Sequence, residues 1–134
     1  MTLALVPYPP QVELTCGPVT SLDLALFAAA SGDHNLLHLD PAAAQAAGFD
    51  RPVVHGMLTM AYTARLCSSH FGAGSVRALQ TRFTGVAKLG DTVKIEARLA
   101  RMEGAQAVYE LSARAQGGGE LMAGTARIER RSAA

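Results

Sequence analysis

The chain is poor in cysteine, which limits the covalent and metal frameworks it can build. Its two cysteines, Cys16 and Cys67, lie far apart and form no CxxC pair. Small secreted domains are rich in disulfides, and zinc knuckles need clustered thiolates. The cysteine pattern therefore argues against both frameworks and fits a reducing compartment, which we expect to be the cytoplasm.

Charge of one sign and long apolar runs are also scarce. The net charge is +1, and the one basic cluster, Arg127, Arg130 and Arg131, is interpreted as a solvated, frayed tail. No run is long enough to span a bilayer. Residues 1–10 lack the basic and apolar segments of a signal peptide. We therefore expect neither a nucleic-acid partner nor a membrane partner.

Length and composition are those of a single globular domain. The chain has 134 residues, of which 49% are apolar and 17% charged. One core is expected at this size, so we predict one domain over residues 1–134. The surplus of apolar residues over charged ones is typical of a chain that buries a surface between subunits.

Apolar spacing predicts helices and loops in the first half of the chain. A short strand is predicted over residues 12–15, followed by a helix that Thr20 or Ser21 caps and Gly32 ends. Asp40 and Pro41 predict the start of a second, short helix that ends at residue 48. A long helix is predicted from residue 56 to residues 71–72. It is apolar around most of its circumference, so we expect it to be largely buried.

After residue 74 the apolar period changes from 3.6 to 2, which indicates strands. Strands are predicted over residues 76–85, 93–100, 107–114 and 121–129. Consecutive strands with short turns predict an antiparallel meander. The expected architecture is α+β, with the helices on one face of a sheet that wraps around the long helix.

The segment from Ser31 to Asp40 is dense in acid–base groups and lies between two predicted helices. Loops held between rigid elements often carry catalysis. Asp33 and His38 are five residues apart and cannot share one helical face. A loop that folds back could aim both side chains into one small cavity.

A second candidate feature is His55-Gly56-Met57, at the predicted start of the long helix. The first N–H groups of a helix have no partner within the helix and carry the positive end of its dipole. Glycine lets a ligand atom approach the backbone closely. The Gly56 N–H therefore suits a developing oxyanion.

These two features together resemble the hydratase signature of the MaoC-like hot-dog family. That family includes (R)-specific enoyl-CoA hydratases and related 3-hydroxyacyl-thioester dehydratases. The family pattern has S-x-D-x-N-P-x-H-x-D, an alanine-rich stretch to G-F, and H-G-M-L. The residues of this chain that match are Ser31, Asp33, Asn35, His38, Asp40, Gly48, Phe49, His55, Gly56, Met57 and Leu58. The stretch from Arg82 to Asp91 resembles the strand and turn that follow.

The resemblance implies a hot-dog fold and a hydro-lyase that acts on enoyl or 3-hydroxyacyl thioesters of CoA or acyl carrier protein. It implies that Asp33 and His38 hold a water, that Gly56 receives the enolate charge, and that Asn35, His55 and Met57 contact the substrate. No cofactor or metal is expected, because the thioester itself activates C3. A homodimer is expected, with a heterodimer or higher assembly as alternatives.

The chain departs from the family pattern at a few positions. Leu36 replaces the proline after the asparagine, and Val86 and Leu89 replace prolines of the later turn. These changes alter loop stiffness and leave the proton-transferring groups in place. Some enoyl-CoA hydratases carry a serine further along the long helix, where this chain has Ala64.

Several other interpretations stay open at this point. Asp40 is interpreted as a helix cap, His34 as solvent-facing, and His55 as a support for the local backbone. Metal ligation by Asp33, His34, His38 and Asp40 lacks a second histidine or cysteine cluster. The competing functions are a hot-dog thioesterase, the catalytic half of a heterodimeric dehydratase and a non-enzymatic partner subunit. Candidate nucleotide contacts are Arg51, Arg82 and Lys88.

Overall fold

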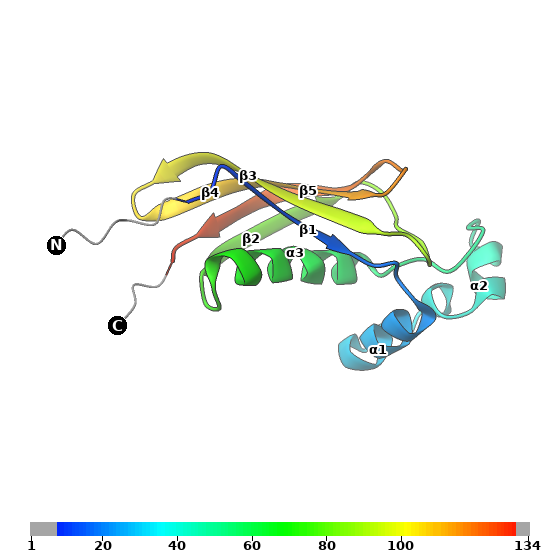
Figure 1. Ribbon diagram of the computed structural model, residues 1–134. Helices are drawn as coiled ribbons and strands as arrows, with labels where there is room; N and C mark the ends of the chain where they lie inside the picture. The colour runs from blue at the N-terminus through cyan, green and yellow to red at the C-terminus, as the bar shows by residue number, and fades with distance from the viewer. Residues whose placement is uncertain (1–7, 131–134) are drawn as a thin grey trace.

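A five-stranded antiparallel sheet carries one long helix along one of its faces (Figure 1). This computed structural model describes residues 8–130. The helices are α1 (Ser21–Ser31), α2 (Pro41–Ala46) and α3 (Gly56–Phe71), with a 3-10 turn, η1 (Leu36–His38), between α1 and α2. The strands are β1 (Gln11–Cys16), β2 (Val76–Phe83), β3 (Val93–Glu103), β4 (Gln106–Ala115) and β5 (Glu120–Ile128).

The strand order is β1-β3-β4-β5-β2. The predicted meander is confirmed for β3, β4 and β5, but it is wrong for β2, which pairs with β5 at the sheet edge. The reason is that residues 84–92 form a crossing connection instead of a tight turn. Within it, Thr84 and Gly85 donate to the Leu121 carbonyl at one end of β5, and Lys88 forms an isolated bridge with Val53.

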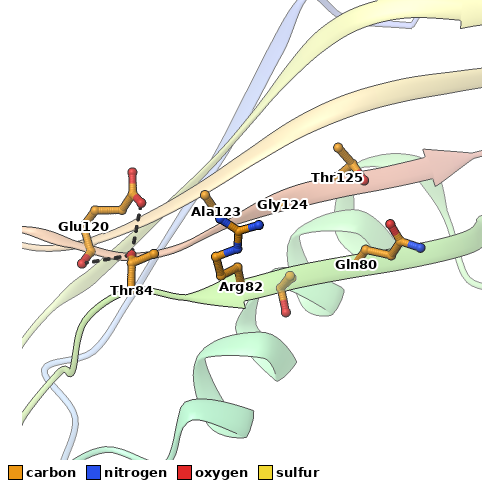
Figure 2. Close-up of a pocket in the computed structure, with 8 residues that line it drawn as sticks. Gln80, Arg82, Thr84, Glu120, Ala123, Gly124 and Thr125 are labelled. Atoms are coloured by element: carbon orange, nitrogen blue, oxygen red, sulfur yellow. Dashed lines mark hydrogen bonds between the residues drawn. The ribbon is translucent and has the colours of Figure 1, made fainter.

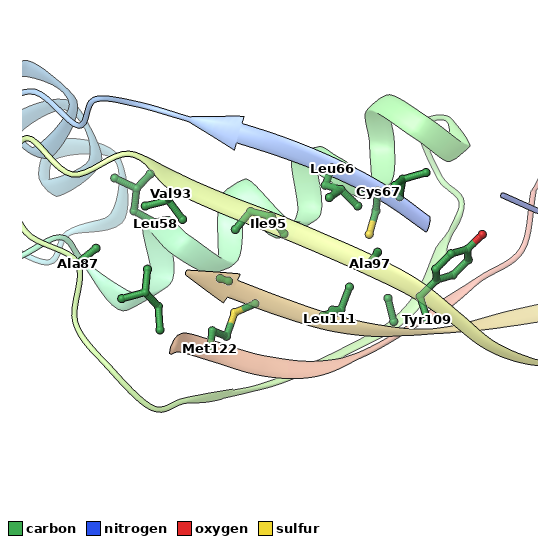
Figure 3. Close-up of a cluster of buried hydrophobic side chains, with 14 of the residues drawn as sticks. Leu58, Leu66, Cys67, Ala87, Val93, Ile95, Ala97, Tyr109, Leu111 and Met122 are labelled. Atoms are coloured by element: carbon green, nitrogen blue, oxygen red, sulfur yellow. The ribbon is translucent and has the colours of Figure 1, made fainter. Parts of the chain in front are cut away.

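The core lies between α3 and the sheet face that packs against it (Figure 3). Val93, Ile95 and Ala97 alternate along β3 and are fully buried, as are Leu66 and Cys67 on α3. Burial of each large apolar side chain contributes about 1.5–3 kcal/mol. The period-2 pattern of the sequence thus sets which face of β3 meets the helix.

Only one side of α3 is buried, so the expectation of a largely buried helix is wrong. Leu58, Thr63 and Leu66 face the sheet, whereas Met57 and Ala61 are exposed. The helix is longer than the other two and lies across the sheet with its opposite face uncovered (Figure 1). An apolar pattern alone does not distinguish burial within a chain from burial against a second chain.

The short helices lie beyond one end of the sheet, near the N-terminus of α3 (Figure 1). The prediction that they lie on the sheet face is therefore wrong. Local caps determine three of their four ends as predicted, and α2 ends at Ala46, two residues before the predicted Gly48. Thr20 and Asp23 form a reciprocal capping box on α1, and Gly32, with a φ of 79°, ends it. Asp40 caps α2, which has Pro41 at its first position. These caps fix both ends of the loop that carries Asp33 and His38.

The prediction of a frayed basic tail is wrong for two of its three residues. Arg127 pairs with Glu103, and the Arg130 guanidinium lies 5.1 Å from the Tyr8 ring centroid. Arg131 lies outside the described residues. So do residues 1–7, which are the larger part of the segment interpreted as lacking a signal peptide. Within residues 8–130 no helix has the length and apolarity needed to cross a membrane.

Candidate active site

A chain of short turns folds the loop between α1 and α2 back on itself. The Ser31 hydroxyl accepts a hydrogen bond from the Asp33 N–H at 3.2 Å, and Asp33 Oδ1 accepts one from the Asn35 N–H at 3.3 Å. Asn35 Oδ1 then caps η1 by accepting from the Leu37 N–H at 3.1 Å. Such side-chain turns offer the backbone an alternative to helix. They place His38 at the end of η1, facing Asp33.

The loop brings the two predicted acid–base groups together. His38 Nε2 lies 3.5 Å from Asp33 Oδ2; the histidine side chain is 10% exposed and the aspartate 51%. His38 Nδ1 lies 2.7 Å from the Val53 carbonyl, which can only accept, so Nδ1 carries the proton. In the neutral ring, Nε2 is then a bare acceptor that faces a carboxylate oxygen. A water that donates one O–H to each acceptor satisfies both groups.

The acceptor that sets this tautomer is itself fixed in place. The Val53 N–H donates to the Leu37 carbonyl at 3.0 Å, and the Val54 N–H donates to the Ala87 carbonyl at 2.8 Å. The segment before α3 is therefore held between η1 and the connection that follows β2. The orientation of the His38 ring depends on both of these contacts.

His38 and Gly56 both line a cavity of about 260 Å³. Its walls are mostly apolar, and its other lining residues are Val53, Val54, Thr59, Phe83, Gly85, Val86, Ala87 and Leu121. Gly56 is the first residue of α3, and a Cβ there would meet the Phe83 ring at 3.5 Å. The cavity thus joins an acid–base group to the positive end of a helix, within space for a small apolar group.

The other predicted substrate contacts lie around the cavity and do not line it. Asn35 is exposed and caps η1. Met57 is 56% exposed, and His55 is 1% exposed behind the cavity wall. His34 is exposed and Asp40 caps α2, as interpreted from the sequence.

Sequence reasoning missed several residues of the cavity wall. Phe83 comes from the end of β2, Leu121 from β5, and Thr59 from α3. Thr59 carried the one usable signal, because a polar residue on the expected buried face of a helix is unusual. Phe83 and Leu121 could not be found, because their place depends on the crossing of residues 84–92.

One group in the described chain has the composition of a metal site. Ligand atoms of Asp33, His38 and His55 lie within 4.8 Å of one another. The two histidine rings are stacked, however, with centroids 3.8 Å apart and an angle of 18° between their planes. A tetrahedral site requires ligand lone pairs that converge on one ion. The lone pairs of stacked rings run side by side and do not converge. The geometry therefore suits proton transfer better than metal binding.

The candidate nucleotide contacts do not gather at one place. Arg51 and Lys88 line a hollow of about 400 Å³ and pair with carboxylates: Arg51 with Asp91 at 2.9 Å and Lys88 with Asp50 at 2.8 Å. The hydrogen bond from Lys88 lowers the pKa of Asp50. Arg82 lines a different hollow, along β2 and β5 (Figure 2). Arg51 and Lys88 remain a joint candidate, and Arg82 stands apart from them.

Similar proteins carry the same fold and related names. The (R)-specific enoyl-CoA hydratase of Aeromonas caviae is 35% identical over 111 residues, which are 80% of this chain and 83% of that protein. The solved structure of the A. caviae (R)-hydratase involved in PHA biosynthesis has a TM-score of 0.84 at 30% identity, covering 90% of this chain and 94% of that one.

A longer relative matches only in part. The peroxisomal hydratase-dehydrogenase-epimerase of Saccharomyces cerevisiae is 40% identical over 78 residues. The match covers 58% of this chain and only 8% of the yeast protein.

The fold is that of a hot-dog domain, an antiparallel sheet packed on one long helix, as predicted. The model of the MaoC-like domain matches residues 10–116 of this chain. The chain therefore belongs to the MaoC-like domain family, which confirms the resemblance seen in the sequence.

Proposed function

We propose that this protein is a hydro-lyase that adds water to a trans-2-enoyl thioester, or removes it from an (R)-3-hydroxyacyl thioester. The observation that carries the proposal is the 3.5 Å approach of His38 Nε2 to Asp33 Oδ2, with the His38 tautomer set by Val53. Relatives named as enoyl-CoA hydratases support the same reaction class. CoA and acyl carrier protein are both proposed as carriers of the acyl group.

The geometry gives each group a role in hydration. A water held by Asp33 and His38 directs its oxygen lone pair away from both acceptors. That oxygen forms a bond to C3 as one acceptor takes a proton. The π electrons of C2=C3 form a C1=C2 bond, and the π electrons of the thioester carbonyl move to its oxygen. The Gly56 N–H stabilises the resulting enolate. The proton then passes to C2 as the enolate collapses, so one water supplies both added groups.

The other predicted site residues have supporting roles in this proposal. Asn35 holds the loop through its cap on η1. Met57 is exposed beside Gly56 and is proposed to contact the part of the substrate outside the cavity. The thioester makes C3 electrophilic, so the proposed reaction needs no cofactor.

Hydration of crotonyl-CoA is the direct test of this proposal. The loss of the conjugated enoyl absorbance reports hydration, and a thiol reagent in a parallel reaction reports CoA release. We expect the first signal without the second. CoA release without hydration would contradict the proposal and favour a thioesterase. His34→Gln, an exposed position in the same loop, serves as the control variant.

We further propose that the protein acts as a homodimer joined through β2. This strand is at the sheet edge, so its outer backbone groups can pair with a second copy. The large apolar side chain of Phe83, the last residue of this strand, is also 45% exposed. Light scattering should give twice the mass of the chain. An inactive monomer that gains activity with a partner subunit would favour the heterodimer instead.

We propose a reducing compartment, the cytoplasm, as the place of action. The support is that Cys16 and Cys67 are both buried free thiols, and burial raises the pKa of Cys67 to about 11. Cell fractionation tests this, and recovery of the protein with another compartment would contradict it.

A further inference from the structure

The His55 ring lies directly behind the acid–base pair. It stacks on the His38 ring, with centroids 3.8 Å apart and planes 18° apart. On another side it meets the Phe27 ring edge to face, with centroids 4.8 Å apart and an angle of 63° between the planes. His55 is 1% exposed and is not part of the cavity wall. It therefore touches the reacting groups without facing the substrate.

The same ring also contacts the other member of the pair. His55 Nε2 lies 3.3 Å from the main-chain carbonyl of Asp33. A carbonyl can only accept, so Nε2 carries the proton and the Nδ1 of the neutral ring is bare. This Nδ1 is buried and has no hydrogen-bond partner among the described residues.

A buried, unpaired acceptor costs folding free energy, so its presence in a native protein calls for an explanation. Packing alone does not explain it, because a phenylalanine would fill the space between Phe27 and His38 without that cost. The part of His55 that phenylalanine lacks is the Nε2–H that reaches Asp33.

We propose that His55 is a positioning residue that fixes both members of the acid–base pair at once. Its ring face holds the His38 ring, and its Nε2–H holds the backbone of Asp33. The inference rests on the proposed hydro-lyase function and deepens it. It replaces the substrate contact that the family resemblance implied for His55, and it gives the other interpretation, a support for the local backbone, a definite partner in Asp33.

The charge state of His55 fits this role. Burial lowers its pKa, the neighbouring His38 lowers it further, and Asp33 opposes the shift. These two are the titratable groups that face the ring, His38 from η1 and Asp33 from the loop; α1 contributes the uncharged Phe27. His55 therefore stays neutral while a proton passes through His38, and two stacked imidazolium rings are avoided.

Three substitutions separate the functions of this ring. The amide of His55→Gln reaches about as far as Nε2 and keeps a donor for the Asp33 carbonyl. The amide of His55→Asn reaches only as far as Nδ1, and His55→Phe keeps a ring without a donor. We expect kcat for crotonyl-CoA to fall about 100-fold in the Asn and Phe variants, as for a misplaced catalytic group. We expect a smaller fall in the Gln variant.

We expect KM to stay at the wild-type value in all three variants, because His55 does not line the cavity. The melting temperature of His55→Phe should equal or exceed that of the wild type, since this change removes the unpaired acceptor. His70→Gln is the matched control. It makes the same change at the other end of α3, where His70 Nε2 faces the Glu13 carbonyl at 3.2 Å, and it should behave as wild type.

Three results would overturn the inference. A raised KM with normal kcat would make His55 a substrate contact. A kcat that follows the melting temperature across the variants would make it a packing residue only. Loss of an ionisation from the pH profile of His55→Gln would make it a proton-transfer group.

A readout without substrate separates this inference from the proposed function. If the wild type hydrates no thioester, the proposed function fails. The inference is then judged by 15N NMR of the histidine rings. We expect His55 to be the neutral Nε2–H tautomer and to titrate below its ordinary value of 6.5. An Nδ1–H tautomer would overturn it.

Discussion

In its neutral form His38 presents a bare Nε2 to the Asp33 carboxylate at 3.5 Å, because its other nitrogen donates to the Val53 carbonyl at 2.7 Å. Two acceptors that face each other at this distance need hydrogen between them. A water with both O–H groups engaged has its lone pair free for attack. The relationship between Asp33 and His38 therefore defines the position of the proposed nucleophile.

Loss of either member of this pair should remove most of the hydratase activity. Asp33→Asn keeps the size of the side chain but removes the negative oxygen. His38→Asn keeps a donor near Nδ1 for Val53 and removes Nε2. We expect kcat/KM for crotonyl-CoA to fall about 10²–10⁴-fold in each variant, with circular dichroism unchanged. Near-normal rates in both folded variants would show that the acid–base pair is assigned wrongly.

Substitution of Gly56 should lower the rate in proportion to the size of the new side chain. A Cβ at this position would lie in ordinary contact with the Phe83 ring, at 3.5–3.6 Å, so Gly56→Ala should fold normally. The additional methyl groups of Gly56→Val would press on Phe83 and enter the space beside the Gly56 N–H. We expect a loss of about 10²–10³-fold in kcat for the valine variant, as when an oxyanion donor is removed.

Steady-state kinetics and thermal melts of the two Gly56 variants check this prediction together. The alanine variant is the comparison for side-chain size, because it adds a Cβ without the pressure on Phe83, and we expect a smaller fall in kcat for it. Equal rates in the wild type and the valine variant would exclude Gly56 as the group that stabilises the enolate.

The parts of the site that were predictable from sequence depend on local contacts. Thr20, Gly32 and Asp40 act on residues within four positions, so the ends of the catalytic loop could be placed correctly. The edge position of β2 depends on pairing with β5, some 45 residues later in the chain. The stack of His55 on His38 depends on how two separate segments dock. Both were therefore beyond the reach of local patterns.

The stability of the protein should fall as the pH drops below about 6.5. The pKa of His55 is lower in the folded protein than its ordinary value, because burial disfavours the charged ring. At a pH between the pKa of His55 in the folded protein and its ordinary pKa, the unfolded chain binds a proton that the folded protein does not. The free energy of unfolding therefore rises with pH in this window. The contribution of His55 to stability is lost as the pH falls through the window.

Chemical denaturation of the wild type and of His55→Phe between pH 5 and pH 8 measures this effect. The variant cannot gain the proton, so its stability should depend less on pH. A steeper dependence in the variant than in the wild type would contradict the direction of the shift. His70→Gln, which changes an exposed histidine on the same helix, provides the comparison.

Proline at position 36, which the family pattern carries, should stabilise this chain without loss of activity. Leu36 is 58% exposed and begins η1, and Asn35 before it has φ −57° and ψ 125°, a conformation that precedes proline readily. We expect Leu36→Pro to add about 0.4–1 kcal/mol to the free energy of unfolding, measured by thermal and urea melts. Leu39→Pro is the opposite control, because the Leu39 N–H donates to the Leu36 carbonyl at 2.9 Å and its loss should destabilise the loop. If Leu36→Pro destabilises as much as Leu39→Pro, the start of η1 does not have the geometry described, and the approach of His38 to Asp33 must depend on other contacts.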